Sequence, residues 1–313
     1  MKPRILLLGK NGQVGRELNG ILGDTSELLA RGREELDLTQ PDCVRKAVRE
    51  FRPHIIVNAA AYTAVDKAEN EEPLAKSINM DAPRVMAEEA KQIGAALIHY
   101  STDYVFDGAK GSPYDEGDAA NPLSAYGRTK LAGEDAIREI GGRFLIFRTE
   151  WVYATRGRNF LLTILRLATE REELRIVSDQ TGAPTWSREI AAATSRIVAD
   201  EWQRDGSEKF LASRGGTYHM TAAGQTSWFQ FASAIVEHVR GCSHRPAWLT
   251  AAIGDKPVIA RRILPIETKD FPTPARRPAY SVLSNALLEQ KFGVKLPDWR
   301  IQLKTALALQ AGR

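Results

Sequence analysis

The chain has 313 residues, of which 43% are hydrophobic and 26% are charged, and its formal net charge is +4. This length accommodates one large domain or two unequal ones, and the composition is that of an ordinary globular protein. The basic residues form no long block, so the sequence argues against a nucleic-acid-binding tail.

The sequence also argues against secretion and membrane insertion. Cys43 and Cys242 stand far apart and outside any CxxC pattern, which disfavours a disulfide scaffold or a cysteine-rich metal site. The first residues enter a strand pattern at once, without the basic region and long apolar core of a signal peptide. No apolar run is long enough to cross a bilayer. We therefore expect a cytoplasmic protein with no membrane or nucleic-acid partner.

The first predicted element is a strand at residues 4–8, an apolar run of the kind that is buried on both faces of a parallel sheet. It leads directly into the turn GKNGQVG, from Gly9 to Gly15, and a helical pattern follows through Leu18 and Leu22. A glycine turn between strand and helix lets a pyrophosphate approach backbone N–H groups at the helix end. A purely structural tight turn is the alternative, but the order of elements favours nucleotide binding.

A second strand is predicted at residues 27–30. In dinucleotide-binding folds an acidic residue at the end of this strand binds the adenosine ribose of NAD. Here the end reads Arg31-Gly32-Arg33, and two arginines suit a 2′-phosphate instead. The sequence therefore favours NADPH and leaves NADH as an alternative. If both arginines are only surface charges, this preference disappears.

Two helices are predicted at residues 39–51 and 72–93. The second helix contains Asn79, and we expect an interruption near Pro83. A polar side chain on such a helix is usually exposed to solvent, so we expect Asn79 to face water.

Two further buried strands are predicted at residues 53–58 and 95–100. Three alanines, Ala59 to Ala61, follow the first strand and leave room for a cofactor, although packing also explains them. The second strand delivers Ser101-Thr102-Asp103 to the same edge of the sheet. Hydroxyl groups there can donate to a carbonyl oxygen and polarise it. A structural serine–threonine turn is the alternative.

A tyrosine and a lysine follow the long loop at residues 104–122. Ser124 begins a predicted helix in which Tyr126 and Lys130 project from one face, because they are four positions apart. A tyrosine with the ordinary pKa of about 10 is a poor proton donor at neutral pH. A cation about 4 Å away can lower that pKa by roughly 3 units. The pair therefore indicates a general acid, although the spacing also occurs by chance.

The second half of the chain alternates less regularly between strands and helices. A strand at residues 143–148 closes the regular part. The later predictions are helices at 159–169, 187–202, 227–240, 285–292 and 299–309, strands near 175–177 and 217–220, and an extended or looping segment at 265–278. We predict an α/β fold, with a Rossmann-type doubly wound parallel sheet in residues 1–150 and a smaller substrate-binding region in 151–313. Some segments of the second region are expected to return to the first.

Seven segments carry a resemblance to a known family: GKNGQVG, VNAAAYTAVDKAE, HYSTDYVFDG, NPLSAYGRTKLAGE, FRTEWVYA, NFLLTILRLA and SDQTGAPTW. In this order they resemble the extended short-chain dehydrogenase/reductase superfamily and, within it, the dTDP-4-dehydrorhamnose reductase family. The resemblance covers nearly the whole chain. STDYVFDG and SDQTGAPT are its most specific elements, since they separate this family from related dehydratases and epimerases.

The resemblance implies an oxidoreductase of dTDP-rhamnose biosynthesis, which supplies a polysaccharide precursor. It would reduce the 4-keto group of dTDP-4-dehydro-L-rhamnose with NADPH. Tyr126 matches the proton donor, Lys130 the lysine that lowers the pKa of that tyrosine, and Thr102 the hydroxyl that binds the substrate oxygen. Asp103 and Trp151 match substrate-binding positions. The positions that we assign to cofactor binding are Gly9, Asn11, Gly12, Gln13, Val14, Arg31, Arg33, Asp37, Leu38, Ala61, Tyr62, Thr63, Tyr100, Tyr126 and Lys130.

The chain departs from the family pattern at two further places. Glu17 and Glu189 match acids that bind magnesium at a subunit contact in some members, but Arg300 stands where a third acid would fall. We therefore expect no tightly held metal, and the resemblance implies a homodimer. Glu150 replaces a small residue that commonly precedes Trp151, and the sequence offers no account of it.

Two other functions remain open at the level of sequence. The chain could reduce a different dTDP-keto-deoxysugar, because the Tyr126–Lys130 pair does not determine the sugar. It could also be a non-catalytic, nucleotide-binding regulatory subunit on the same fold, although such a module has no need of a proton donor.

Overall fold

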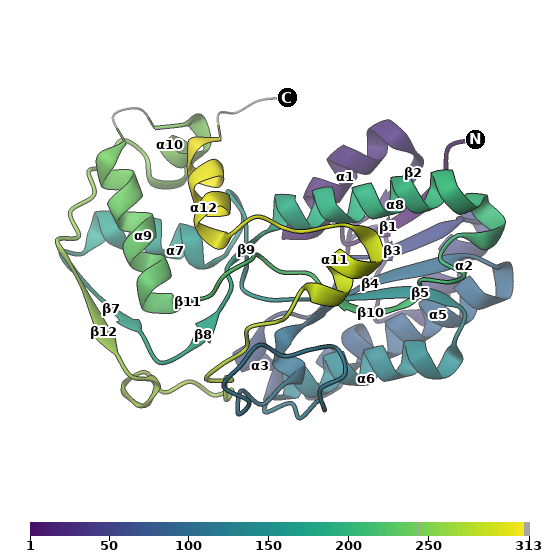
Figure 1. Ribbon diagram of the computed structural model, residues 1–313, viewed down its shortest axis with the longest axis horizontal. Helices are drawn as coiled ribbons and strands as arrows, with labels where there is room; N and C mark the ends of the chain where they lie inside the picture. The colour runs from purple at the N-terminus through teal and green to yellow at the C-terminus, as the bar shows by residue number, and fades with distance from the viewer. Residues whose placement is uncertain (243–244, 310–313) are drawn as a thin grey trace.

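A parallel six-stranded sheet forms the centre of the computed structural model, which describes residues 1–242 and 245–309 (Figure 1). Its strand order is β10-β5-β4-β3-β1-β2, and all neighbouring strands run parallel. The strands are β1 (Arg4–Leu8), β2 (Glu27–Arg31), β3 (Ile55–Asn58), β4 (Ala96–Thr102), β5 (Arg143–Thr149) and β10 (Gly216–His219). The order reverses between β1 and β3, which is where such sheets bind ligands at their carboxyl edge.

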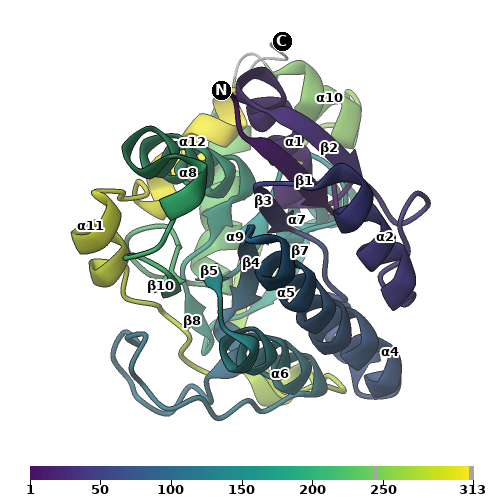
Figure 2. The same cartoon turned by 90° about the vertical axis from the view of Figure 1, so that its right-hand side faces the viewer.

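Helices cover both faces of this sheet (Figure 2). On one face lie α1 (Gln13–Thr25), α8 (Ser187–Lys209) and α11 (Ala286–Phe292), and on the other α2 (Pro41–Phe51), α5 (Ala82–Ile93) and α6 (Ala125–Ile140). Successive strand residues point to opposite faces. In β1, Ile5 and Leu7 therefore join the first core, while Leu6 and Leu8 join the second. This explains why the strand is an uninterrupted apolar run, and it confirms the predicted Rossmann-type fold class.

The predicted helix at 72–93 is not continuous. It consists of α4 (Glu72–Lys76), a π-helical turn (Ser77–Asp81) and α5, preceded by the short α3 (Val65–Ala68). The irregular turn comes directly before Pro83, which lies in the first turn of α5 and has no N–H to donate to the preceding helical turn. Asn79 lies in the π-helical turn and is buried, so the expectation that it faces water was wrong.

A second hydrophobic core lies beyond the carboxyl edge of the sheet. It is built from α7 (Phe160–Glu170), α9 (Trp228–Gly241), α10 (Ala247–Ile253) and α12 (Trp299–Ala308). Short strand pairs accompany them: β7 (Glu173–Val177) with β12 (Arg262–Ile266), β6 (Val152–Tyr153) with β9 (Thr185–Trp186), and β8 (Thr181–Gly182) with β11 (Thr226–Ser227). The sequence analysis missed α10 and β12. β12 was not predicted because it contains Pro265, and a proline is unusual in a strand unless the strand has a free edge.

Residues beyond 151 also contribute to the first layer: β10 pairs with β5, and α8 packs along α1. In the part of the chain that the structure describes, no helix combines the length and apolarity needed to cross a bilayer.

Candidate active site

A cleft of about 820 Å³ opens at the carboxyl edge of the sheet. The ends of β1 to β5, the start of α6 and the segment after β5 all contribute to its walls. The structure brings every predicted site residue to this one cleft. They are Gly9, Asn11, Gly12, Gln13, Val14, Arg31, Arg33, Asp37, Leu38, Ala61, Tyr62, Thr63, Tyr100, Thr102, Asp103, Tyr126, Lys130 and Trp151.

The turn after β1 leaves the amino end of α1 open to the cleft. Gly9 has a φ of 85°, and a Cβ atom there would lie 2.6 Å from the backbone nitrogen of Ala60. Only glycine therefore lets this turn sit against the end of β3. Gly12 caps α1 without a side-chain hydrogen bond, and the first turn of α1 carries no acidic residue. The free N–H groups and the positive end of the helix dipole suit a pyrophosphate.

Two arginines stand at the end of β2, beside the cleft. Arg31 and Arg33 form no ion pair with any residue in the described ranges, so both guanidinium groups remain available to an anion. Sequence reasoning missed the neighbouring Glu35. Its carboxylate accepts from the N–H of Gly32 at 2.7 Å and pairs with Lys10 at 2.5 Å. These hydrogen bonds lower the pKa of Glu35, first through Lys10. The Glu35 carboxylate is therefore already paired with a cation.

Two residues at the start of α6, Ser124 and Gly127, allow this helix to pack close to the end of β4. The Ser124 hydroxyl accepts from the N–H of Gly127 at 3.2 Å and caps the helix. A Cβ atom at Gly127 would lie only 2.2 Å from the carbonyl oxygen of Tyr104. Glycine thus permits the close approach that brings Tyr126 to the end of β4.

Tyr126 is almost fully buried at the floor of the cleft. Its ring makes an edge contact with Tyr104, with centroids 5.5 Å apart, and its phenol lies beside the Thr102 hydroxyl. The predicted lowering of its pKa by Lys130 was wrong for this structure. Burial raises the pKa of Tyr126 to about 12, and only the Thr102 hydroxyl opposes that change. The phenol is therefore protonated at neutral pH.

Lys130 is buried one helical turn further on. Its Nζ contacts the carbonyl oxygen of Tyr100 at 2.5 Å and Nε2 of His99 at 3.1 Å. Nδ1 of His99 in turn contacts Nδ2 of Asn58 at 3.0 Å. Burial lowers the pKa of Lys130 to about 8 and that of His99 well below its ordinary value. The amine is thus anchored to β3 and β4 and is not bonded to the Tyr126 phenol.

Thr102 ends β4 and Asp103 follows it, in the same cleft as Tyr126. The Thr102 hydroxyl donates to Oδ1 of Asp103 at 2.9 Å and accepts from the N–H of Tyr104 at 3.2 Å. The Thr102 hydroxyl therefore also makes the contact of a structural serine–threonine turn. Burial raises the pKa of Asp103 to about 6.

The buried Asn79 connects two walls of the cleft. Its Oδ1 accepts from the N–H of Tyr62 at 2.8 Å, and its Nδ2 donates to the carbonyl of Tyr62 at 3.1 Å and to Thr129 Oγ1 at 3.2 Å. One amide therefore holds the turn after β3 against α6. The sequence contains no signal for this role, because the partners are 17 and 50 residues away.

Trp151 follows β5 and faces the second core. Its φ of 44° is rare for a residue with a side chain, and the ring is stacked on Trp228 at 3.5 Å. Trp228 also lines the cleft. It was not predicted, because it lies 77 positions after Trp151 in the sequence. The stacked pair forms an apolar part of the cleft wall.

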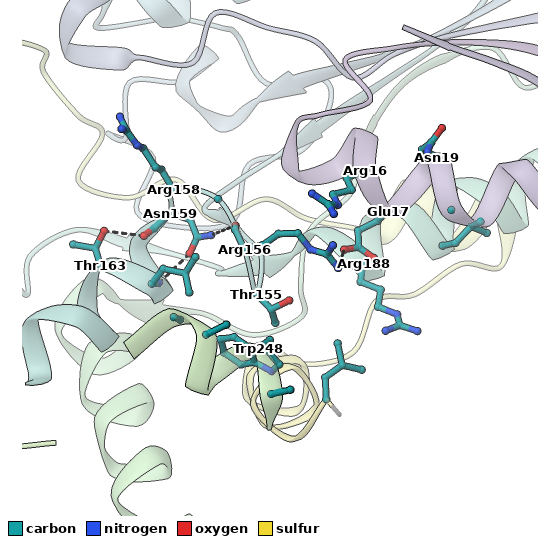
Figure 3. Close-up of a pocket in the computed structure, with 18 of the residues that line it drawn as sticks. Arg16, Glu17, Asn19, Thr155, Arg156, Arg158, Asn159, Thr163, Arg188 and Trp248 are labelled. Carbon is teal, nitrogen blue, oxygen red and sulfur yellow. Dashed lines mark hydrogen bonds and ion pairs between the residues drawn. The ribbon is translucent and has the colours of Figure 1, made fainter. Parts of the chain in front are cut away.

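A second groove, of about 1330 Å³, lies between α1, α7 and α10 and contains none of the predicted site residues (Figure 3). It is lined by several arginines, including Arg16, Arg156 and Arg188. Glu17 lies there 3.8 Å from Arg156. Among residues 1–242 and 245–309 no group of three or more His, Cys, Asp or Glu side chains is arranged to hold a metal.

Comparison with known proteins shows the family to which the chain belongs. The family model described as "RmlD substrate binding domain" matches residues 1–311. A dTDP-4-dehydrorhamnose reductase of Burkholderia thailandensis is 50% identical over 95% of this chain and 95% of its own length. One of Escherichia coli K12 is 42% identical over 97% of this chain and 96% of its own length. The crystal structure of the dTDP-4-dehydrorhamnose reductase from Bacillus anthracis, in complex with NADP, superposes with a TM-score of 0.84 and 34% identity, covering 97% of this chain and 98% of that one. The chain belongs to the dTDP-4-dehydrorhamnose reductase family.

Proposed function

We propose that this protein reduces the 4-keto group of dTDP-4-dehydro-L-rhamnose to give dTDP-L-rhamnose, with NADPH as the reductant. The observation that carries the proposal is the buried set Thr102, Tyr126 and Lys130, at the floor of a cleft that also contains a pyrophosphate-binding turn. The Burkholderia and Escherichia relatives named for this reaction support it.

The residues of the cleft fit a dinucleotide. The open amino end of α1 suits a pyrophosphate, and the free guanidinium groups of Arg31 and Arg33 suit a 2′-phosphate. Ala61, Tyr62 and Thr63 would lie along the cofactor, and Tyr100 and Lys130 would lie near its nicotinamide end. When bound, NADPH supplies the hydride that the carbonyl carbon requires.

The protein's own part in the reaction is to supply a proton. As charge develops on the carbonyl oxygen, Tyr126 donates its phenolic proton to that oxygen. A phenol kept protonated by burial suits this direction of reaction, because a donor must carry its proton at the start. The Thr102 hydroxyl stabilises the developing charge. Asp103 and Trp151 would position the sugar.

An activity assay tests the proposal directly. Purified protein is mixed with the keto-sugar nucleotide and NADPH, and absorbance at the nicotinamide band is followed. We expect NADPH oxidation that requires the sugar. A protein that binds NADPH without oxidising it would contradict the assignment, and co-purification with a larger enzyme would then favour a regulatory subunit. A panel of dTDP-keto-deoxysugars distinguishes the proposed substrate from its relatives.

Cofactor preference provides a second prediction. Arg33→Ala, alone or with Arg31→Ala, should raise the Kd for NADPH by about tenfold or more and leave that for NADH nearly unchanged. The reason is that a hydrogen bond to a charged group contributes about 1.5–3 kcal/mol, and only NADPH carries the 2′-phosphate. Fluorescence titration with both cofactors measures the effect, with Arg171→Ala on the exposed end of α7 as a control. Equal weakening of both cofactors would mean that the arginines do not recognise the phosphate.

The proposal also covers the roles of the two regions, the location in the cell, the oligomeric state and the metal content. We infer that residues 1–150 bind mainly the cofactor and residues 151–313 mainly the sugar. We also infer a cytoplasmic homodimer without a tightly held metal. Light scattering on the purified protein tests the dimer, and metal analysis of the same sample tests the last point.

A further inference from the structure

Glu150 is a buried acid that the proposed reaction does not use. It follows β5, lines the substrate cleft and is 1% exposed. Asp103 is equally buried, and its charge acts on the Glu150 carboxyl. Neither acid forms an ion pair with a residue in the described part of the chain. Two uncompensated carboxylates at such a position would be very costly, since burial and like charge both disfavour ionisation.

The polar contacts of Asp103 and Glu150 leave two carboxyl oxygens without a donor, so a proton can bind there. The Ser281 hydroxyl donates to Oε2 of Glu150 at 3.2 Å and also lies beside Asp103. A hydroxyl has one proton, so Ser281 cannot donate to both carboxyls at once. The remaining oxygens, Oδ2 of Asp103 and Oε1 of Glu150, are buried without a hydrogen-bond partner among the described residues. Unpaired acceptors of this kind are costly unless one of the acids carries a proton.

Ser281 is itself firmly placed. Its N–H donates to the carbonyl of Thr181 at 2.9 Å, and the N–H of Thr181 donates to the carbonyl of Ala279 at 2.8 Å. The hydroxyl is therefore held between the ends of β4 and β5 by backbone pairing with β8. The acids and the serine form one rigid group below Thr102.

We propose that Asp103 and Glu150 together hold a single proton, and that Glu150 is a positioning residue that fixes Asp103 and, through it, the Thr102 hydroxyl. Thr102 donates to Oδ1 of Asp103, so the orientation of the Asp103 carboxyl determines where the hydroxyl points. A second negative charge on the pair would push the two carboxyls apart and move Thr102 away from Tyr126. Glu150 therefore acts in the site through Asp103, although it does not contact the reacting atoms.

The surrounding titratable groups agree with one shared proton. Burial, and then the neighbouring Asp103, raise the pKa of Glu150 well above its ordinary value. The other ionisable groups that interact with the pair are tyrosines: Tyr104 and Tyr126 with Asp103, and Tyr280 with Glu150. Arg277 interacts with Tyr104, and no cation among the described residues forms an ion pair with either acid.

Infrared spectroscopy of the full chain in D₂O at neutral pH tests the proton without any substrate. We expect a C=O band of a protonated carboxyl in the unaltered protein and its loss in Glu150→Gln. Glu150→Ser, which restores a small side chain, should also remove the band and serves if the glutamine variant does not fold. Glu89→Gln is the matched control, because Glu89 is also buried but is paired with Arg49 at 2.6 Å. That variant should retain the band. A spectrum without the band, or a band that persists in both Glu150 variants, overturns the proposal.

Kinetics test the positioning role, which rests on the proposed reductase activity. Between pH 7 and 9, kcat should fall about tenfold more in the unaltered enzyme than in Glu150→Ser. Only the unaltered enzyme has the Asp103–Glu150 pair, which loses its shared proton in this range. Titration of Lys130 and Tyr126 affects both proteins alike and cancels in the comparison. Identical pH profiles would refute the positioning role. If the keto-sugar is not reduced at all, the proposed function fails, while the infrared result still decides whether the proton is shared.

Discussion

Tyr126→Phe should lower kcat by about a hundredfold or more and leave the Kd for NADPH nearly unchanged. General acid catalysis typically contributes 10²–10⁴-fold, and the substitution removes only the phenolic proton. The phenylalanine ring can keep the edge contact with Tyr104, at 5.5 Å between centroids, so the floor of the cleft retains its shape. Steady-state turnover of the keto-sugar and fluorescence titration of NADPH measure the two quantities.

The neighbouring tyrosine provides the matched control for this experiment. Tyr104→Phe removes a buried phenol that interacts with Arg277 rather than with Thr102. We expect less than a tenfold loss of kcat, which is small beside the effect at Tyr126. Unchanged turnover in Tyr126→Phe would remove this residue from the mechanism. Equal losses in both variants would indicate a general disturbance of the cleft.

The parts of the site that were predictable from sequence depend on local backbone chemistry. The turn from Gly9 to Gly15 needs small residues between a strand and a helix, and that need is written in adjacent positions. The spacing of Tyr126 and Lys130 follows from helical periodicity in the same way. Parallel strands end at one edge of their sheet, which brings Thr102 and the turn together once the strands are assigned.

The parts that escaped prediction depend on contacts between distant segments. Ser281 reaches Glu150 across 131 positions, and nothing in either neighbourhood indicates the other. Trp228 stacks on Trp151 because α9 begins beside the cleft, which no local pattern specifies. Asn79 looked like a surface residue because the π-helical turn that directs it inward has no distinctive composition.

The electrostatic error at Tyr126 has the same origin. Sequence spacing places Lys130 on the same helical face but does not say what its amine contacts. In the structure the Lys130 amine contacts Tyr100 and His99 of β4, so burial determines the pKa of the Tyr126 phenol. A periodicity argument determines which residues are neighbours on a helix. It does not determine the sign of a pKa shift, which depends on the neighbouring strand.

Gly127→Ala should lower kcat/KM by about a hundredfold, although it removes none of the predicted catalytic side chains. The added Cβ would lie 2.2 Å from the carbonyl oxygen of Tyr104 and 3.0 Å from Cβ of Pro122, so α6 must move by about 1 Å. A displacement of that size in a catalytic group can cost about 10²-fold in rate. Helix propensity acts in the opposite direction, because alanine is favoured over glycine by about 1 kcal/mol within a helix. Gly23→Ala in α1 is the control, since its Cβ would meet only a side-chain carbon at 3.9 Å. The control should gain a little thermal stability and keep full activity. A Gly127→Ala enzyme with the same behaviour would show that the close packing of α6 against Tyr104 does not position Tyr126.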